Sequence, residues 1–143
     1  MKPNRHARGG LAVTLRLAAV TVDCEDALIV ARFWAAALDR PLDPKSSSDF
    51  ASIGMVEHRD PEGWRLDGEP TWLFQRVPER KTAKNRMHVD MATADRDTEV
   101  ARLVGLGATR VADMNEWGYE WTVLHDPEGN EFCVVRPKVT LTR

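Results

Sequence analysis

The sequence lacks an apolar run long enough to cross a bilayer. Its most apolar stretch near the start, residues 11–22, contains Arg16 and leads directly into an acidic cluster, so we interpret it as a strand and expect neither a secretory signal nor a membrane contact. An excess of one charge is also missing, because 20 basic residues stand against 22 acidic residues and give a formal net charge of −2. Such a balance does not attract a polyanion, and we expect no nucleic-acid partner.

Cysteine is scarce as well. Cys24 and Cys133 show no C-x-x-C spacing and are too few for a disulfide framework, which favours free thiols and a cytoplasmic location. The sequence contains no P-loop, no G-x-G-x-x-G fingerprint and no Ser-His-Asp order, so nucleotide binding and serine hydrolysis have no support. Its length of 143 residues and hydrophobic content of 43% suit one soluble domain.

Two short segments recur in the same order along the chain. Residues 30–33 (Val-Ala-Arg-Phe) return as residues 100–103 (Val-Ala-Arg-Leu), and the sequence Asp-Pro-Glu-Gly at residues 60–63 returns at residues 126–129. The repetition indicates a duplicated unit whose two copies bury their apolar faces against each other. We expect a ligand to bind in the cleft between the copies.

Each copy is predicted to contain a strand, a helix and three strands. In the first, the strand covers residues 15–22, Asp26 is the N-cap of a helix over residues 27–38, and the clearest later strand covers residues 71–77. This helix is apolar almost all round, with Arg32 as its only charge. We therefore expect either its sheet and a partner subunit to cover it or much of it to lie bare.

The second copy repeats this order. A strand is predicted over residues 86–91 and a helix from about residue 95 to 106, closed by Gly107. Three strands follow, near residues 110–114, 119–125 and 131–136. The charged segment between the copies marks a module boundary, which gives one domain over residues 15–138 with modules at about 15–78 and 85–137. We expect residues 1–14 to be a mobile tail and residues 139–143 a second tail.

The doubled pattern, with Asp26-x6-Phe33-Trp34 after the first strand and Asp-Pro-Glu-Gly-Asn at residues 126–130, resembles the vicinal oxygen chelate superfamily. More narrowly it resembles the glyoxalase-like domain proteins, a group with the glyoxalase, bleomycin resistance and extradiol dioxygenase fold. The resemblance covers about residues 15–137. It implies an α+β fold in which two tandem βαβββ modules form a curled, U-shaped mixed sheet with helices on the outer face.

The resemblance also implies a divalent metal held by four side chains, two from each module and usually His or Glu. The flanking motifs place these positions on Ala19, Gln75, His88 and Cys133. Alanine has no donor atom and glutamine offers only a weak neutral oxygen, whereas Cys133 could bind zinc as a thiolate. This set falls short of a stable site, so we favour no metal cofactor; if one is bound, Zn, Ni, Fe or Mn would lie on Gln75, His88 and Cys133.

The residues themselves point to the same region. Strict alternation over residues 86–91 places Arg86, His88 and Asp90 on one face of the strand. If the intervening apolar residues pack under the helices, His88 and Asp90 look into the cleft and can share a water or a ligand. The alternative is a structural histidine with satisfied hydrogen bonds.

The chain has five Trp and a single Tyr, a bias that suits stacking on a flat ligand. We expect Trp34 and Trp72 in the core, because they lie in apolar runs. Trp64 and Trp117 lie beside glycines and are candidates for the lip of a pocket, while Trp121 lies on a strand either face of which could line the cleft. The basic residues at 80, 81, 84 and 86 either hold an acidic group of the ligand or form a solvated linker.

Three functions remain open. The first is a metal-independent site for a small organic molecule, lined by Gln75, Arg86, His88, Trp121 and Cys133, in which His88 would be the acid or base and Asp90 would orient it. The second is a metal-dependent lyase, isomerase or dioxygenase of the glyoxalase type. The third is a dimeric, non-catalytic interaction module that uses the apolar first helix. We expect a homodimer in each case, and whether one chain or two close the cleft stays open.

Overall fold

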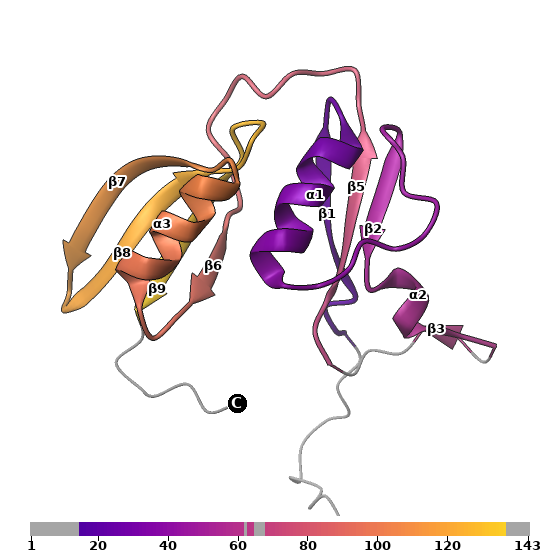
Figure 1. The fold of residues 1–143 in the computed structure, drawn as a ribbon, viewed down its shortest axis with the longest axis horizontal. Helices are drawn as coiled ribbons and strands as arrows, with labels where there is room; N and C mark the ends of the chain where they lie inside the picture. The colour runs from indigo at the N-terminus through magenta and orange to yellow at the C-terminus, as the bar shows by residue number, and fades with distance from the viewer. Residues whose placement is uncertain (1–14, 62, 65–67, 137–143) are drawn as a thin grey trace, which may run out of the picture.

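The computed structural model describes residues 15–61, 63–64 and 68–136. The predicted tails at residues 1–14 and 139–143 lie outside this range. The described residues form an α+β fold of two modules, each with its own open sheet, and the expected fold class is thus confirmed (Figure 1). No helix among them is long and apolar enough to span a bilayer.

Module 1 builds a three-stranded sheet in the order β1-β5-β2, in which β1 runs parallel and β2 antiparallel to β5. Its elements are β1 (Ala19–Cys24), α1 (Ala27–Leu38), β2 (Phe50–Ile53), α2 (Met55–His58), β3 (Arg59–Asp60), β4 (Gly63–Trp64) and β5 (Thr71–Arg76). Three strands were expected after α1, but only β2 and β5 join this sheet. The short helix α2 and the two-residue strands β3 and β4 stand between them.

The predicted first strand began too early. Leu15 and Leu17 are 88% and 70% exposed, and β1 begins only at Ala19. Ala19 is also the first residue with a partner on β5, where it pairs with Thr71. Pro70 precedes Thr71, and because proline lacks a backbone N–H it cannot extend the ladder in that direction.

Module 2 builds a four-stranded sheet in the order β6-β9-β8-β7. Its elements are β6 (Val89–Ala92), α3 (Arg96–Leu106), β7 (Thr109–Glu116), β8 (Tyr119–His125) and β9 (Glu131–Arg136). The helix and the last three strands agree with the prediction, whereas the strand expected over residues 86–91 begins only at Val89. Met87 is therefore 88% exposed instead of packing under the helices.

The helices begin where the sequence predicts because their caps are local. The Asp26 carboxylate accepts from the backbone N–H groups of Leu28 and Ile29 at 3.0 and 3.1 Å. The Asp95 carboxylate accepts from the N–H of Thr98 at 3.1 Å. Each aspartate satisfies donors that have no partner inside the helix, which fixes the first turn.

Helix α1 of module 1 lies between its own sheet and module 2. Trp34 stacks on Trp72 of its own sheet, with ring centroids 4.7 Å apart, and meets Phe132 of module 2 edge-on at 4.8 Å. Trp34 and Trp72 are 3% and 5% exposed, so their predicted place in the core is confirmed. Module 2 of the same chain thus covers part of α1, an arrangement that neither of the two expected alternatives included.

Three side chains fasten α1 to module 2. The Glu128 carboxylate accepts from the backbone N–H groups of Glu25 and Asp26 at 2.6 and 2.9 Å, just before the helix. At its other end, Arg102 of α3 donates to the carbonyls of Ala36 and Ala37 at 3.1 and 2.7 Å. Asp126 accepts from the Trp34 indole N–H and is described below.

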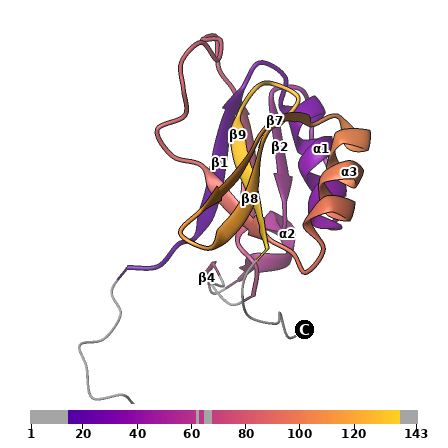
Figure 2. The same ribbon diagram turned by 90° about the vertical axis from the view of Figure 1, so that its left-hand side faces the viewer.

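Figure 2 shows α1 and α3 together on one side of the molecule, with the strands on the other. One face of each sheet packs against these helices. The opposite face of the module 2 sheet carries three of the residues that the sequence singled out, Asp90, Trp121 and Cys133.

Candidate functional site

The pairing of the module 2 strands places two rows of side chains on the sheet face away from the helices. The first row is Asp90, Cys133, Val123 and Ala112, and the second row is Ala92, Val135, Trp121 and Met114. We call these eight residues the open sheet face. The residues that alternate with them, Phe132, Val134 and Leu124, are fully buried in the core. Along β8 and β9, therefore, the side chains that alternate with the open sheet face are buried against the core.

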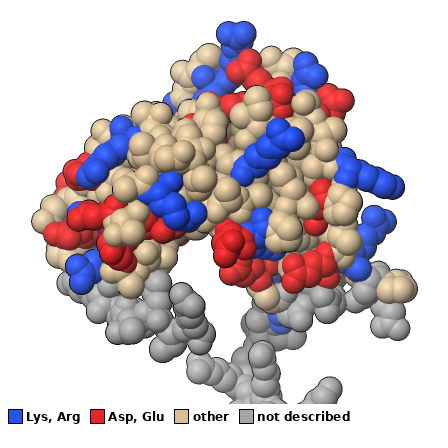
Figure 3. All heavy atoms as spheres, viewed as in Figure 1, with Lys and Arg blue, Asp and Glu red and all other residues tan. Residues whose placement is uncertain are grey.

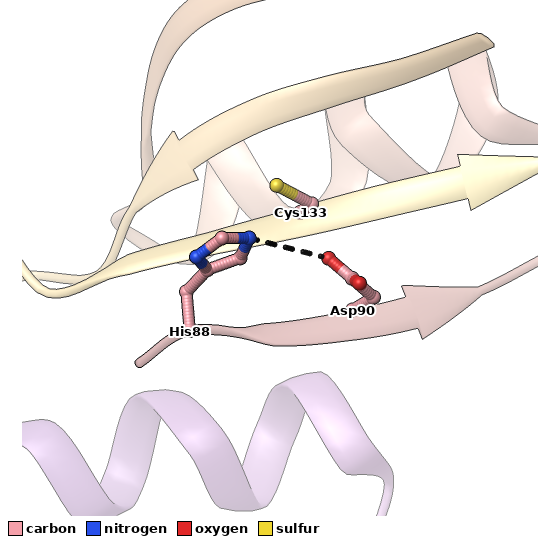
Figure 4. A group of neighbouring side chains, drawn as sticks. All are labelled: His88, Asp90 and Cys133. Atoms are coloured by element: carbon pink, nitrogen blue, oxygen red, sulfur yellow. Dashed lines mark ion pairs between the residues drawn. The ribbon is translucent and has the colours of Figure 1, made fainter. Parts of the chain in front are cut away.

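Three chemically active side chains meet at the β6 edge of the open sheet face (Figure 4). His88 immediately precedes β6, Asp90 lies on β6, and Cys133 lies opposite Asp90 on β9. The His88 Nε2 and Asp90 Oδ1 atoms are 3.7 Å apart, and the donor atoms of all three residues lie within 4.8 Å of one another. The His88 and Asp90 side chains are 45% and 65% exposed, whereas Cys133 is buried.

Cys133 is a neutral thiol at neutral pH. Burial and, second, the charge of the Asp90 carboxylate raise the pKa of Cys133 to about 11. A thiol is nucleophilic only as its thiolate. The buried sulfur is therefore a small apolar floor beside the polar pair, and covalent catalysis by Cys133 is disfavoured.

The four-ligand metal implied by the resemblance does not fit module 1. Ala19 and His88 each stand seven residues before the N-cap of the next helix, Asp26 or Asp95, which makes them equivalent. Ala19 pairs with Thr71, whereas Gln75 pairs with Asp23. Ala19 and Gln75 are thus four residues apart along paired strands, roughly 13 Å, too far to share an ion.

The strand registers identify a different counterpart for Cys133. Val20 pairs with Trp72 in module 1, as Val89 pairs with Phe132 in module 2. The next residue on β5 after Trp72 is Leu73, so Leu73 corresponds to Cys133, and its side chain has no donor atom. The donors that could hold a metal therefore all come from module 2.

The tryptophans that were predicted to line a ligand site lie in different places. Trp121 is half-buried on the open sheet face, opposite Val135 and Met114. Trp117 is 83% exposed at the turn between β7 and β8. The side chain of Trp64 lies outside the described residues. Of the three, the structure places Trp121 in the sheet that carries His88 and Asp90.

The basic cluster between the modules takes part in local pairing. Arg80 pairs with Glu25 at 3.2 Å, Lys84 pairs with Glu131, and Lys81 donates to the carbonyl of Ala83. Arg86 is exposed. On the face drawn in Figure 3, acidic and basic side chains are mixed. These contacts favour the solvated linker over an anion site.

Two hollows lie away from the open sheet face. One of about 440 Å³ in module 1 is lined by residues that include Arg40 and the buried His58. One of about 320 Å³ lies beside the start of α3, next to Arg96 and Arg136. Each belongs to a single module, and the cleft expected between the modules stays a prediction.

Alternation on β8 and β9 could have identified Val123 and Val135 from the sequence, because each lies two residues from a residue already singled out. Met114 lies on β7, and its place opposite Trp121 follows only from the strand register. The missing information was which face of β8 is open. The buried Thr122 and Leu124 decide this in favour of the face with Trp121.

Residues 19–135 match the family model described as glyoxalase-like domain. Solved structures of proteins with related descriptions share the fold. A glyoxalase/bleomycin resistance protein/dioxygenase family enzyme from Burkholderia phytofirmans is 16% identical with a TM-score of 0.64, and the match covers 85% of this chain and 98% of that one. A fosfomycin resistance protein from Mesorhizobium loti is 13% identical with a TM-score of 0.61, and the match covers 87% of this chain and 93% of that one.

A lactoylglutathione lyase from Agrobacterium tumefaciens is 14% identical with a TM-score of 0.58, over 86% of this chain and 94% of that one. None of the curated proteins compared with the chain matches it. At these identities the structural likeness establishes the fold, and it transfers no ligand or reaction.

Proposed function

The chain belongs to the glyoxalase-like domain family, and from this premise we propose that it binds a small organic molecule on the open sheet face without the divalent metal of the family fold. The observation that carries the proposal is the meeting of His88, Asp90 and Cys133 beside an apolar surface. His88 and Asp90 contact the polar group of the ligand, and the apolar residues contact its body.

The surface has the properties of a ligand site. Met114, Trp121, Val123 and Val135 are apolar and half-buried, and they lie beside one another on this face. Removing such side chains from water contributes about 25 cal/mol per Å² of apolar area. Small-molecule sites combine apolar side chains with a few convergent polar groups, and this surface offers both.

The polar pair can also move a proton. An imidazole can act as an acid or a base, and Asp90 lies at ion-pair distance, 3.7 Å, from the His88 ring. Because Nε2 faces Asp90, a ligand would exchange its proton with the other ring nitrogen of His88, Nδ1. The structural relatives are named as a lyase, a resistance protein and an oxidase, so the fold is compatible both with binding and with chemistry.

A second candidate is a metal-dependent enzyme. Asp90 adds a carboxylate that the predicted set of Gln75, His88 and Cys133 did not include, and the donor atoms of His88, Asp90 and Cys133 lie within 4.8 Å of one another. Catalytic zinc sites use three protein ligands and leave one position open. This observation favours testing zinc before other metals.

Metal content per protomer separates the two candidates. Untagged protein, purified without chelator, is analysed for metals as isolated and after dialysis against Fe, Ni, Mn, Co and Zn. We expect less than stoichiometric metal throughout. A stoichiometric metal that is lost in both His88→Ala and Cys133→Ala would refute the metal-free site and support the second candidate. Asp97→Ala, an exposed carboxylate on α3, is the matched control.

A further inference from the structure

The open sheet face has a polar end and an apolar end. His88 and Asp90 occupy the β6 edge, and Val135, Trp121 and Met114 form the second row toward β7. Asp90 and Trp121 are separated by two strand spacings across the sheet and two residues along it, about 12 Å between Cα atoms. Both side chains point out of the sheet, so only their widths take up part of this distance, and the gap that is left has the length of one or two fused rings.

The floor between these ends is low. Cys133, Val123 and Ala112 are small or short side chains, and they lie in one row across three neighbouring strands. The larger Trp121 and Met114 border this floor in the next row. A flat ligand fits such a surface, because an indole ring stacks on aromatic rings and a methionine sulfur makes favourable contacts with ring edges.

The charge on this surface selects the polar group of the ligand. Asp90 is the only formally charged residue among the eight of the open sheet face, and the Cys133 thiol beside it is neutral. Glu131, two residues before Cys133 on β9, also carries a charge near the thiol, but it pairs with Lys84. A carboxylate accepts a hydrogen bond from a hydroxyl group and repels a second carboxylate. The site therefore favours a neutral hydroxyl over an anionic group.

From these three observations we propose that the ligand class of this site is a neutral hydroxyaromatic compound, with its ring over Cys133 and Val123 against Trp121 and its hydroxyl at His88 and Asp90. The proposal rests on the proposed function. It assigns Trp121 and Asp90 as the residues that determine specificity, Trp121 for the ring and Asp90 for the charge.

Three matched probes test the class. 2-Naphthol carries the predicted ring and hydroxyl, 2-naphthoate carries the same ring with a carboxylate, and decahydro-2-naphthol carries the same hydroxyl on a saturated body. Binding to the full chain is measured by isothermal titration calorimetry, and the site is mapped by amide chemical-shift changes. We expect 2-naphthol to bind at least about ten-fold more tightly than either of the others, with shifts centred on β6, β8 and β9.

Two variants assign the roles. Trp121→Leu keeps an apolar side chain and is expected to remove the preference for 2-naphthol over decahydro-2-naphthol. Asp90→Asn keeps the size and a hydrogen-bond acceptor, and it is expected to remove the preference over 2-naphthoate. Trp117→Ala, at the exposed turn, is the control and should change neither preference. Circular dichroism and thermal unfolding verify that each variant is folded.

The outcomes distinguish this inference from the proposed function. If decahydro-2-naphthol or 2-naphthoate binds to the open sheet face as tightly as 2-naphthol, the ligand class is wrong while the binding site stands. Unchanged preferences in folded Trp121→Leu and Asp90→Asn would also overturn the inference. If none of the three probes shifts residues of β6, β8 or β9, both proposals fail.

Discussion

The indole N–H of Trp34 in module 1 donates to the Asp126 carboxylate of module 2 at 3.2 Å. Asp126 is 2% exposed, and its other contacts come from the backbone N–H groups of Glu128 and Asn130 and from the Asn130 amide. The second Asp-Pro-Glu-Gly segment is therefore a joint between modules. Through Asp126 it binds the Trp34 side chain of α1, and through Glu128 it binds the backbone at the start of that helix.

Removal of the Asp126 carboxylate should destabilise the whole chain. In Asp126→Ala the Trp34 indole N–H and the N–H groups of Glu128 and Asn130 lose their buried acceptor, and each unsatisfied group costs about 1–3 kcal/mol. We expect the free energy of unfolding, measured in urea, to fall by about 3 kcal/mol or more. Asp97→Ala serves as the exposed control. A change of the same size in both variants would contradict the role of the joint.

Glu128 should contribute less than Asp126, because it is only partly buried. Glu128→Gln keeps the shape of the side chain but removes the charge that accepts from the N–H groups of Glu25 and Asp26. We expect a loss of about 1 kcal/mol in the free energy of unfolding. The loss should become smaller as the salt concentration rises, because salt screens the charge of Glu128. The exposed Glu79→Gln is the matched control, and equal unfolding midpoints for the two variants would show that Glu128 does not stabilise α1.

The parts of the structure that the sequence predicted are those set by neighbouring residues. Asp26 and Asp95 fix the helix starts because a cap needs only the next three residues. The beginning of β1 at Ala19 depends on Pro70, about fifty residues away, and no local pattern contains it. The contact of Arg102 with the end of α1 is likewise visible only once the modules pack.

The same distinction applies to the candidate site. Alternation around His88 predicted the face of Asp90 because it requires only a period of two. The assignment of Gln75 as a ligand position came from flanking motifs, which do not determine strand register. The pairing of β1 with β5 makes Leu73 the counterpart of Cys133, and this pairing is a tertiary property.

Both cysteines should resist alkylation in the folded protein. Burial raises the pKa of Cys24 to about 12 and that of Cys133 to about 11, with nearby carboxylates as the second cause. We expect iodoacetamide to label neither thiol at pH 7.5 on the time scale on which it labels both in urea. Asp90→Asn removes the carboxylate that helps to raise the pKa of Cys133, and it should speed labelling of Cys133 but not of Cys24. Rapid labelling of Cys133 in the wild type would show that the thiol is neither buried nor neutral.

The raised pKa values of the two thiols predict that the free energy of unfolding falls at alkaline pH. Their pKa values are higher in the folded chain than the ordinary value of 9.0, so the neutral form is favoured by folding. Their contribution is complete below pH 9 and is lost as the pH rises toward 11 and 12, because the unfolded chain ionises first. We expect the urea midpoint to fall between pH 8 and pH 10. This fall should be smaller in Cys133→Ala, and an equal fall would assign the effect to other groups.

The turn between β7 and β8 carries a residue that the backbone disfavours. Trp117 has φ +52° and is 83% exposed, and Gly118 follows with φ +76°. Two successive positive φ angles define a two-residue turn for which Asn-Gly is the preferred sequence, whereas a bulky residue is strained at the first position. Trp117→Asn should therefore raise the free energy of unfolding by about 0.5–1 kcal/mol. Trp117→Val, which is β-branched, should lower it, and binding of 2-naphthol should be unchanged in both. A stability that falls in Trp117→Asn would show that the exposed indole makes a contact that outweighs the strain of its backbone.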